Sequence, residues 1–146
     1  SVAVLSLCFA LAGCPDGSVG IATRTIVLQP SHDMNRNAAL SVDVVLVFDE
    51  RLATTLDGLS AGQWFPQKKA FLAAHAGALM LRHFELVPSQ PAAPVELSGH
   101  DRKAIAVIVF ANYLSEGTHR WRLDRFEKPL LRLGRETFSI VEGDGQ

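Results

Sequence analysis

Alternating apolar and polar positions divide most of the chain into short β-strands. The clearest strand is residues 40–48 (LSVDVVLVF), in which every second residue from Leu40 to Phe48 is apolar. On the opposite face Ser41 and Asp43 precede two valines. That face is therefore expected to begin exposed and to end buried.

Further strands follow from the same criterion. They are predicted at residues 24–29, 79–87, 95–97, 104–114, 118–125 and 136–142, and residues 130–133 are ambiguous. In residues 79–87 the side that carries Met80, Phe84 and Leu86 is expected to be buried, although Arg82 interrupts it. The tight turn at Glu116 predicts that residues 104–114 and 118–125 pair as a hairpin.

Residues 60–75 form the one segment with the pattern of a helix. Ser60 and Gln63 have the spacing of a capping box. Pro66 is compatible with this helix if the helix proper begins near Phe65, after a turn at residues 60–64. The side chains expected to face the core are Trp64, Phe71 and Leu72.

Many short strands with one added helix predict a mainly β protein, a β-sandwich over residues 24–142 followed by a short tail at residues 143–146. Hydrophobic residues make up 48% of the 146 residues, which is enough to close a core. The net charge of −1 argues against nonspecific nucleic-acid binding.

The N-terminal segment is the most specific signal in the chain. Residues 1–13 (SVAVLSLCFALAG) are uncharged and too short to span a bilayer, because thirteen helical residues cover only about 20 Å. They match the apolar core of a signal peptide that is truncated at its start. Leu11-Ala12-Gly13-Cys14 has the pattern of a bacterial lipobox, which predicts diacylglycerol and an acyl chain on Cys14 and a flexible tether at residues 14–23.

Two other interpretations of this segment remain open at this point, an ordinary secretory peptide and a buried N-terminal strand. The only cysteines are Cys8, which is lost with the leader, and Cys14, which carries the lipid. A mature domain with neither a disulfide nor a zinc or redox cysteine pair is therefore expected.

Sequence motifs give little support for catalysis. Ser31-His32-Asp33 spells a triad, but consecutive side chains splay apart and cannot form the relay. The five histidines have no ligand spacing, so we expect neither an enzyme, nor a metal site, nor a cofactor other than the lipid. Asp33, Asn35 and Asn37 alternate as at the start of a calcium loop, but the rest of that pattern is absent; side chains that bond their own backbone explain them better.

Basic residues outnumber acidic ones between residues 120 and 135. They are Arg120, Arg122, Arg125, Lys128, Arg132 and Arg135. The preferred interpretation is the solvated face of a strand and its following loop. The alternative is a docking patch for an acidic partner.

The order of several segments resembles one known family. The LAGC lipobox is followed by a first strand, by Asp33-Met34-Asn35-Arg36-Asn37 before a valine-rich strand, and by Gln63-Trp64-Phe65 in the helix. Residues 106–123 (AVIVFANYLSEGTHRWRL) match that family's final hairpin in style. Together these features resemble the outer-membrane lipoprotein of the bacterial type VI secretion system, the TssJ family, also called SciN.

This resemblance implies a transthyretin-like β-sandwich and a non-enzymatic role as the outer-membrane anchor of the secretion envelope complex. The implied location is the periplasmic face of the outer membrane, with several copies side by side in a ring-like assembly. The implied partner is the periplasmic C-terminal domain of the inner-membrane subunit TssM. In the family the loop between the first two strands contacts that partner, which implicates residues 30–39 and, within them, Asp33, Met34, Asn35 and Arg36.

Two other classes of function remain. An accessory or pilotin-type lipoprotein of another envelope secretion machine would bind a partner helix in an apolar groove, for which the space between the helix and the sheet is a candidate. An exported small-molecule or sugar binder would need a pocket, for which the candidate lining residues are Trp64, Trp121 and Tyr113. Core packing explains the two tryptophans more simply.

Overall fold

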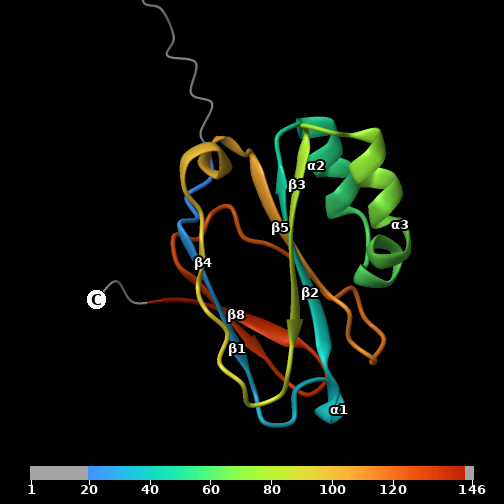
Figure 1. The fold of residues 1–146 in the computed structure, drawn as a ribbon, viewed down its shortest axis with the longest axis vertical. Helices are drawn as coiled ribbons and strands as arrows, with labels where there is room; N and C mark the ends of the chain where they lie inside the picture. The colour runs from blue at the N-terminus through green and yellow to red at the C-terminus, as the bar shows by residue number, and fades with distance from the viewer. Residues whose placement is uncertain (1–19, 144–146) are drawn as a thin grey trace, which may run out of the picture.

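Two four-stranded sheets lie face to face, and two helices cover the outer side of one of them (Figure 1). The computed structural model describes residues 20–143. The strand orders are β4–β1–β7–β8 and β3–β2–β5–β6. The strands are β1 Thr25–Pro30, β2 Leu40–Val47, β3 Leu79–Leu86, β4 Val95–Glu96, β5 Ala106–Ala111, β6 Arg120–Arg122, β7 Pro129–Leu133 and β8 Phe138–Glu142. The predicted mainly β sandwich is confirmed.

The first sheet is built around a parallel pair. β1 runs parallel to β7, with Leu28 opposite Leu131, whereas β4 and β8 add to the two outer sides in antiparallel register. Residues 130–133, ambiguous in the sequence, thus occupy the middle of a sheet. They belong to β7, in which Pro129, Leu131 and Leu133 are buried and alternate with more exposed residues.

The second sheet has β2 and β5 at its centre. β2 pairs antiparallel with both β3 and β5, and β5 pairs with β6, with Val109 opposite Trp121. The predicted hairpin is therefore confirmed. All six residues of β5 are buried, because one face of the strand packs on the first sheet and the other on the helices.

Two apolar clusters hold these layers together. The inner cluster lies between the sheets, and the alternating residues Leu40, Val42, Val44 and Leu46 of β2 belong to it. The outer cluster joins Val45 and Val47, on the other face of β2, to the helices. The period of two in β2 therefore distributes its side chains between two cores, as the sequence predicts for all but Asp43.

The sandwich carries two helices on one side, and the expectation of a single added helix is wrong. The helix α2 (Glu50–Asp57) precedes α3 (Ala61–Ala74). Asp49 caps α2 by accepting a hydrogen bond from the Leu52 N–H at 2.9 Å, and Leu52, Ala53 and Leu56 are buried against the sheet. α2 has only eight residues, of which three are apolar and buried, so its periodic pattern was too short to predict a helix from the sequence.

The start of α3 also differs from the expectation. The capping box of Ser60 and Gln63 is present. The helix begins directly after Ser60, at Ala61, and not near Phe65. The Trp64 N–H already donates to the Ser60 carbonyl at 2.9 Å. Pro66 lies inside the helix, where its missing N–H leaves only the carbonyl of the exposed Gly62 without its usual donor.

Asp43 is fully buried, which corrects the expectation that its face of β2 begins exposed. Its carboxylate accepts a hydrogen bond from the Trp64 indole N–H at 2.8 Å and pairs with the Lys68 ammonium at 3.1 Å. The His83 imidazole on β3 also bonds it. A buried charge is tolerated only when it is paired in this way, so Asp43 fastens α3 to the sheet.

On β3 the predicted buried side is correct for Leu86 and in part for Phe84, both of which contact the inner cluster. It is wrong for Met80, which is 36% exposed. β3 is an edge strand of its sheet, so the residues between its two buried ends receive less cover than those of β2.

The predicted signal peptide at residues 1–13, the lipidation site at Cys14 and most of the tether lie outside the described residues, as do residues 144–146. Across residues 20–143, no helix is both long and apolar enough to cross a bilayer.

Candidate protein-docking site

The loop between β1 and β2 contains an unusual backbone turn. The short element α1 (Met34–Asn37) includes three consecutive residues with positive φ: 49° at Asn35, 56° at Arg36 and 64° at Asn37. This left-handed conformation is tolerated by asparagine but costs an L-residue such as arginine about 1–2 kcal/mol. Strain of this kind persists only where surrounding contacts enforce it, so the contacts of this turn explain why its conformation is stable.

Asn35 provides the internal support of the turn. It is only 2% exposed, its amide donates to the Ala39 carbonyl at 2.9 Å, and its side-chain oxygen accepts the Leu114 N–H at 2.8 Å. Its own N–H donates to the Gly134 carbonyl at 3.2 Å. One side chain thus connects α1 to the loop after β5, while its backbone reaches the turn between β7 and β8.

Met34 anchors the turn to the core of the sandwich. Its side chain is fully buried in the inner cluster with residues of both sheets. Met34, which the resemblance implicates in partner binding, therefore has no exposed side-chain surface. Together with Asn35, Met34 positions the loop, and the exposed surface of the loop belongs to its neighbours.

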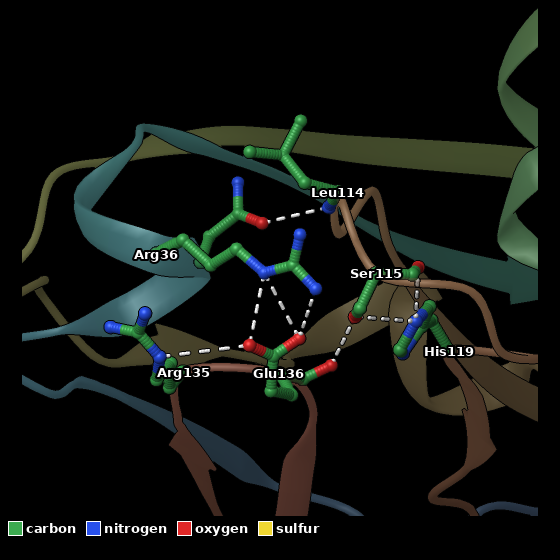
Figure 2. A network of polar contacts seen from close by, with 7 residues as sticks. Arg36, Leu114, Ser115, His119, Arg135 and Glu136 are labelled. Carbon is green, nitrogen blue, oxygen red and sulfur yellow. Dashed lines mark hydrogen bonds and ion pairs between the residues drawn. The ribbon is translucent and has the colours of Figure 1, made fainter.

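Arg36 is the charged residue of the turn, and it is exposed. Figure 2 shows its guanidinium directed at the Glu136 carboxylate, which it meets through two nitrogens at 2.8 and 2.9 Å. Arg135 approaches the same carboxylate at 3.6 Å. The hydrogen bonds from Arg36 lower the pKa of Glu136, with a further contribution from the charges of both arginines, and Glu136 in turn raises the pKa of Arg36.

Asp33 is partly exposed at the start of the turn. It does not cap α1, and its carboxylate accepts a hydrogen bond from the Ser31 hydroxyl at 2.9 Å. This bond is the main reason that the pKa of Asp33 is lowered. The Asn35 side chain bonds the backbone of its own loop, as the sequence suggested in preference to a calcium site, whereas Asp33 bonds the Ser31 side chain.

Three loops meet at this end of the sandwich. Besides α1, they are the β5–β6 connection, with Leu114 and Ser115, and the β7–β8 turn, with Arg135 and Glu136 (Figure 2). The Ser115 hydroxyl donates to the Glu136 carbonyl. Leu114 is 65% exposed, the largest value among the exposed large apolar side chains of the described chain. We name these residues, with Asp33 and Arg36, the α1 surface.

Of the α1 surface, the sequence identified Asp33 and Arg36 but not Leu114 or Glu136. Leu114 ends the most apolar segment of the chain, and its position next to the turn at Glu116 was the only available signal. Glu136 lies 100 residues after Arg36, and nothing in the local pattern connects the two.

The basic residues between positions 120 and 135 do not form one face. Arg120 contacts the Asp57 carboxylate at 3.3 Å and the Leu59 carbonyl at 2.7 Å, and Arg122 pairs with Asp124 at 2.7 Å. Arg132 belongs to β7, in the other sheet. The structure thus shows no single basic face, and Arg120 and Arg122, which the preferred interpretation placed on the solvated face of a strand, are paired with neighbouring carboxylates.

Other candidate chemistry finds no support in the described residues. No group of three or more histidine, cysteine, aspartate or glutamate side chains in residues 20–143 could hold a metal ion. Trp64 is fully buried and stacks on Phe110, with 5.0 Å between ring centroids, and Tyr113 is also buried. Both belong to the core, whereas Trp121 is 45% exposed.

Sequence comparisons give no relative of this chain: no family model matches, and no significant match is found among curated proteins. Structure comparisons do give neighbours. The chain is similar to the type VI secretion lipoprotein TssJ1 of Pseudomonas aeruginosa, with a TM-score of 0.65 and 19% identity over 85% of this chain and 98% of that one.

Two further solved structures are similar to this chain in fold. One is Lip of Serratia marcescens, a membrane-bound component of the type VI secretion system, with a TM-score of 0.60, 18% identity and coverage of 82% and 96%. The other is described as the C-terminal domain of the type VI secretion protein TssM from EAEC, with a TM-score of 0.62, 16% identity and coverage of 82% and 100%. The chain therefore has the fold of the TssJ-type lipoproteins of type VI secretion, as the resemblance of its sequence implies.

Proposed function

We propose that this protein is a non-enzymatic lipoprotein of a type VI secretion envelope complex. Acyl chains on Cys14 hold it at the periplasmic face of the outer membrane. The α1 surface binds the periplasmic C-terminal domain of a TssM-type inner-membrane subunit. The fold shared with TssJ1 and Lip, and the lipobox in the sequence, support this assignment.

The observation that carries the proposal is the position of α1 relative to the start of the described chain. Figure 1 shows the chain entering at one end of the sandwich and α1 at the opposite end. Gly20 lies at the entry end, where a side-chain Cβ on it would meet the Arg102 carbonyl at 3.0 Å. From there β1 (Thr25–Pro30) crosses the domain and leads directly into the α1 loop.

The length of the tether completes this geometry. Cys14 precedes Gly20 by six residues, a reach of at most about 20 Å even when fully extended. A lipid on Cys14 therefore holds the entry end near the bilayer. A partner that approaches from the other membrane then meets the α1 end first.

The chemistry of the α1 surface suits a protein partner. Arg36 keeps one terminal nitrogen of its guanidinium outside its bonds to Glu136, and Leu114 offers an exposed apolar side chain. The left-handed turn is fixed before binding by Asn35 and Glu136, so little conformational freedom remains to be lost on association.

The test is calorimetric titration of residues 15–146 with the periplasmic C-terminal domain of the TssM-type protein from the same source. The informative variant is Arg36→Gly, because glycine adopts the left-handed conformation without strain and removes only the side chain. The matched control is Arg125→Ala, an exposed arginine near the entry end, where the adjacent Asp124 carbonyl accepts the Ala22 N–H.

We expect micromolar or tighter binding by the unmodified fragment, a loss of about tenfold or more in Arg36→Gly, and no change in Arg125→Ala. Absence of binding by the well-folded fragment would contradict the proposal. In that case an accessory lipoprotein of another secretion machine would become the better assignment.

A further inference from the structure

A groove lies beside the α1 surface, at the open side of the sandwich between the edge strands β6 and β8. Its volume is about 480 Å³. It is lined by two segments, residues 115–121 and residues 136–138. Trp121 of β6 lies on one wall, is 45% exposed, and meets the Phe138 ring edge-on at a centroid distance of 6.4 Å. A half-exposed tryptophan beside a concave surface has the composition of an interface hot spot.

The lining of the groove is held by one contact to α3 and by two contacts among its own residues. The Thr118 carbonyl accepts the N–H of Ala61, the first residue of α3, at 2.8 Å. The Ser115 hydroxyl bonds the Glu136 carbonyl, and the His119 ring lies within hydrogen-bond distance of the Ser115 carbonyl at 2.9 Å (Figure 2). Gly117 has a φ of 149°, and a Cβ there would meet the His119 ring at 2.9 Å, so the ring packs only because position 117 is glycine.

One carboxylate that lines the groove is available to a cationic occupant. Arg120 lines it, but its guanidinium is engaged by Asp57 and the Leu59 carbonyl. Glu136 is engaged by both Arg36 and Arg135. Glu116 is exposed on the rim and takes part in no ion pair found within residues 20–143. The groove therefore combines an aromatic wall with an available carboxylate.

We infer that this groove binds an arginine side chain of the partner, with its guanidinium stacked on the Trp121 indole and paired with the Glu116 carboxylate. Arginine fits better than lysine, because its plane stacks on an aromatic face while its edge still donates to a carboxylate. The inference rests on the proposed function, since the partner is the TssM-type periplasmic domain that meets the adjoining α1 surface. Glu136 lies in both sites and makes them one continuous interface.

The direct test uses the two tryptophans of the chain as reporters. Protein labelled with 5-fluorotryptophan gives two ¹⁹F resonances, one from the buried Trp64 and one from Trp121, assigned by the Trp121→Phe variant. Addition of the unlabelled partner domain should shift or broaden the Trp121 resonance and leave the Trp64 resonance unchanged. Binding that moves neither resonance would overturn the inference and leave the proposed function intact.

Affinity measurements separate the groove from the α1 turn. We expect Trp121→Ala to weaken binding about tenfold or more, and Glu116→Gln roughly three- to fivefold with a weaker dependence on salt. The matched controls are Val141→Ala, which truncates an exposed apolar residue on β8, and Glu96→Gln on β4; both should bind normally. Because Glu116 lies in an exposed turn, its variant should keep the fold even if Trp121→Ala does not.

The outcomes distinguish the two levels of the proposal. Normal affinity in both groove variants, with loss of binding in Arg36→Gly, would reject the groove and keep the partner. Absence of binding by the unmodified protein would reject the partner itself. Self-association that is abolished by Trp121→Ala would show that a second copy of the chain occupies the groove, which would also overturn the inference.

Discussion

Replacement of Asn35 by alanine tests whether the left-handed turn is built by one buried side chain. The change removes the hydrogen bond from the Asn35 amide to the Ala39 carbonyl at 2.9 Å and the bond from the Leu114 N–H to the Asn35 side-chain oxygen at 2.8 Å. Each such bond contributes a net of about 1 kcal/mol to stability, so the two together contribute about 2 kcal/mol. Alanine also tolerates the positive φ of 49° less well than asparagine.

Asn37 provides the control for this second effect. It has a φ of 64° in the same turn but is exposed. Asn37→Ala therefore loses the same backbone preference without the buried bonds. The difference in unfolding free energy between the two variants should be about 2 kcal/mol, with Asn35→Ala the less stable.

The assay is urea denaturation of both variants and the unmodified fragment, followed by circular dichroism. In a thermal scan the same difference should appear as about 6–10 °C between the melting temperatures of the two variants, given about 3–5 °C per kcal/mol for a domain of this size. Equal stability of the two variants would refute the role assigned to the Asn35 side chain. It would mean that the burial of Met34 alone is enough to hold the turn.

Three other perturbations follow from the structure. Cys14→Ala should move the protein from the membrane fraction to the soluble fraction while its melting temperature stays unchanged; retention on the membrane would contradict the lipid anchor. The pKa of Glu136 is lowered in the folded state from its ordinary value of 4.5, so its pairing with Arg36 stabilises the fold at neutral pH and is lost as the pH falls through the lowered pKa. A carboxyl ¹³C titration should therefore give Glu136 a pKa below 4.5 that rises toward it in Arg36→Gly, and an unchanged value would disprove the pairing. Asp43→Ala leaves the buried indole N–H of Trp64 without its acceptor, so it should destabilise the fold by about 3–5 kcal/mol in chemical denaturation. An exposed control such as Glu96→Ala should cost under about 0.5 kcal/mol.

The regular strands could be predicted from the sequence because each has a strong local pattern. Residues 40–48 alternate between the two cores, and β5 and β6 pair as a hairpin through the connection at residues 112–119. The strand pattern and the hairpin both depend on residues that are close together in the sequence. The order of segments from the lipobox to the final hairpin then sufficed to indicate the fold that the structure neighbours share.

The elements that escaped prediction depend on distant contacts or on short patterns. The parallel pairing of β1 with β7 joins segments about a hundred residues apart. Asp43 is charged yet buried, because Trp64 and Lys68 reach it from α3. The helix α2 has only eight residues and was too short for its period to be distinguished from a loop.

The loop between β1 and β2 shows the same division most clearly. Its place between the first two strands, and the exposure of Arg36, agree with the sequence prediction. The left-handed turn does not follow from the local sequence, since arginine disfavours it. It is held by a carboxylate 100 residues away and by a buried asparagine, so only the folded structure reveals which side chains of the loop are exposed.

Site-specific photo-cross-linking of the full-length lipoprotein in its own cells tests the orientation of the domain most directly. A photoreactive amino acid in place of His32, exposed in the α1 loop, probes one end of the sandwich, and the same amino acid in place of Arg102 probes the entry end. The proposed orientation predicts a cross-link to the TssM-type subunit from position 32 and none from position 102. Cross-links to that subunit from position 102, with none from position 32, would contradict it.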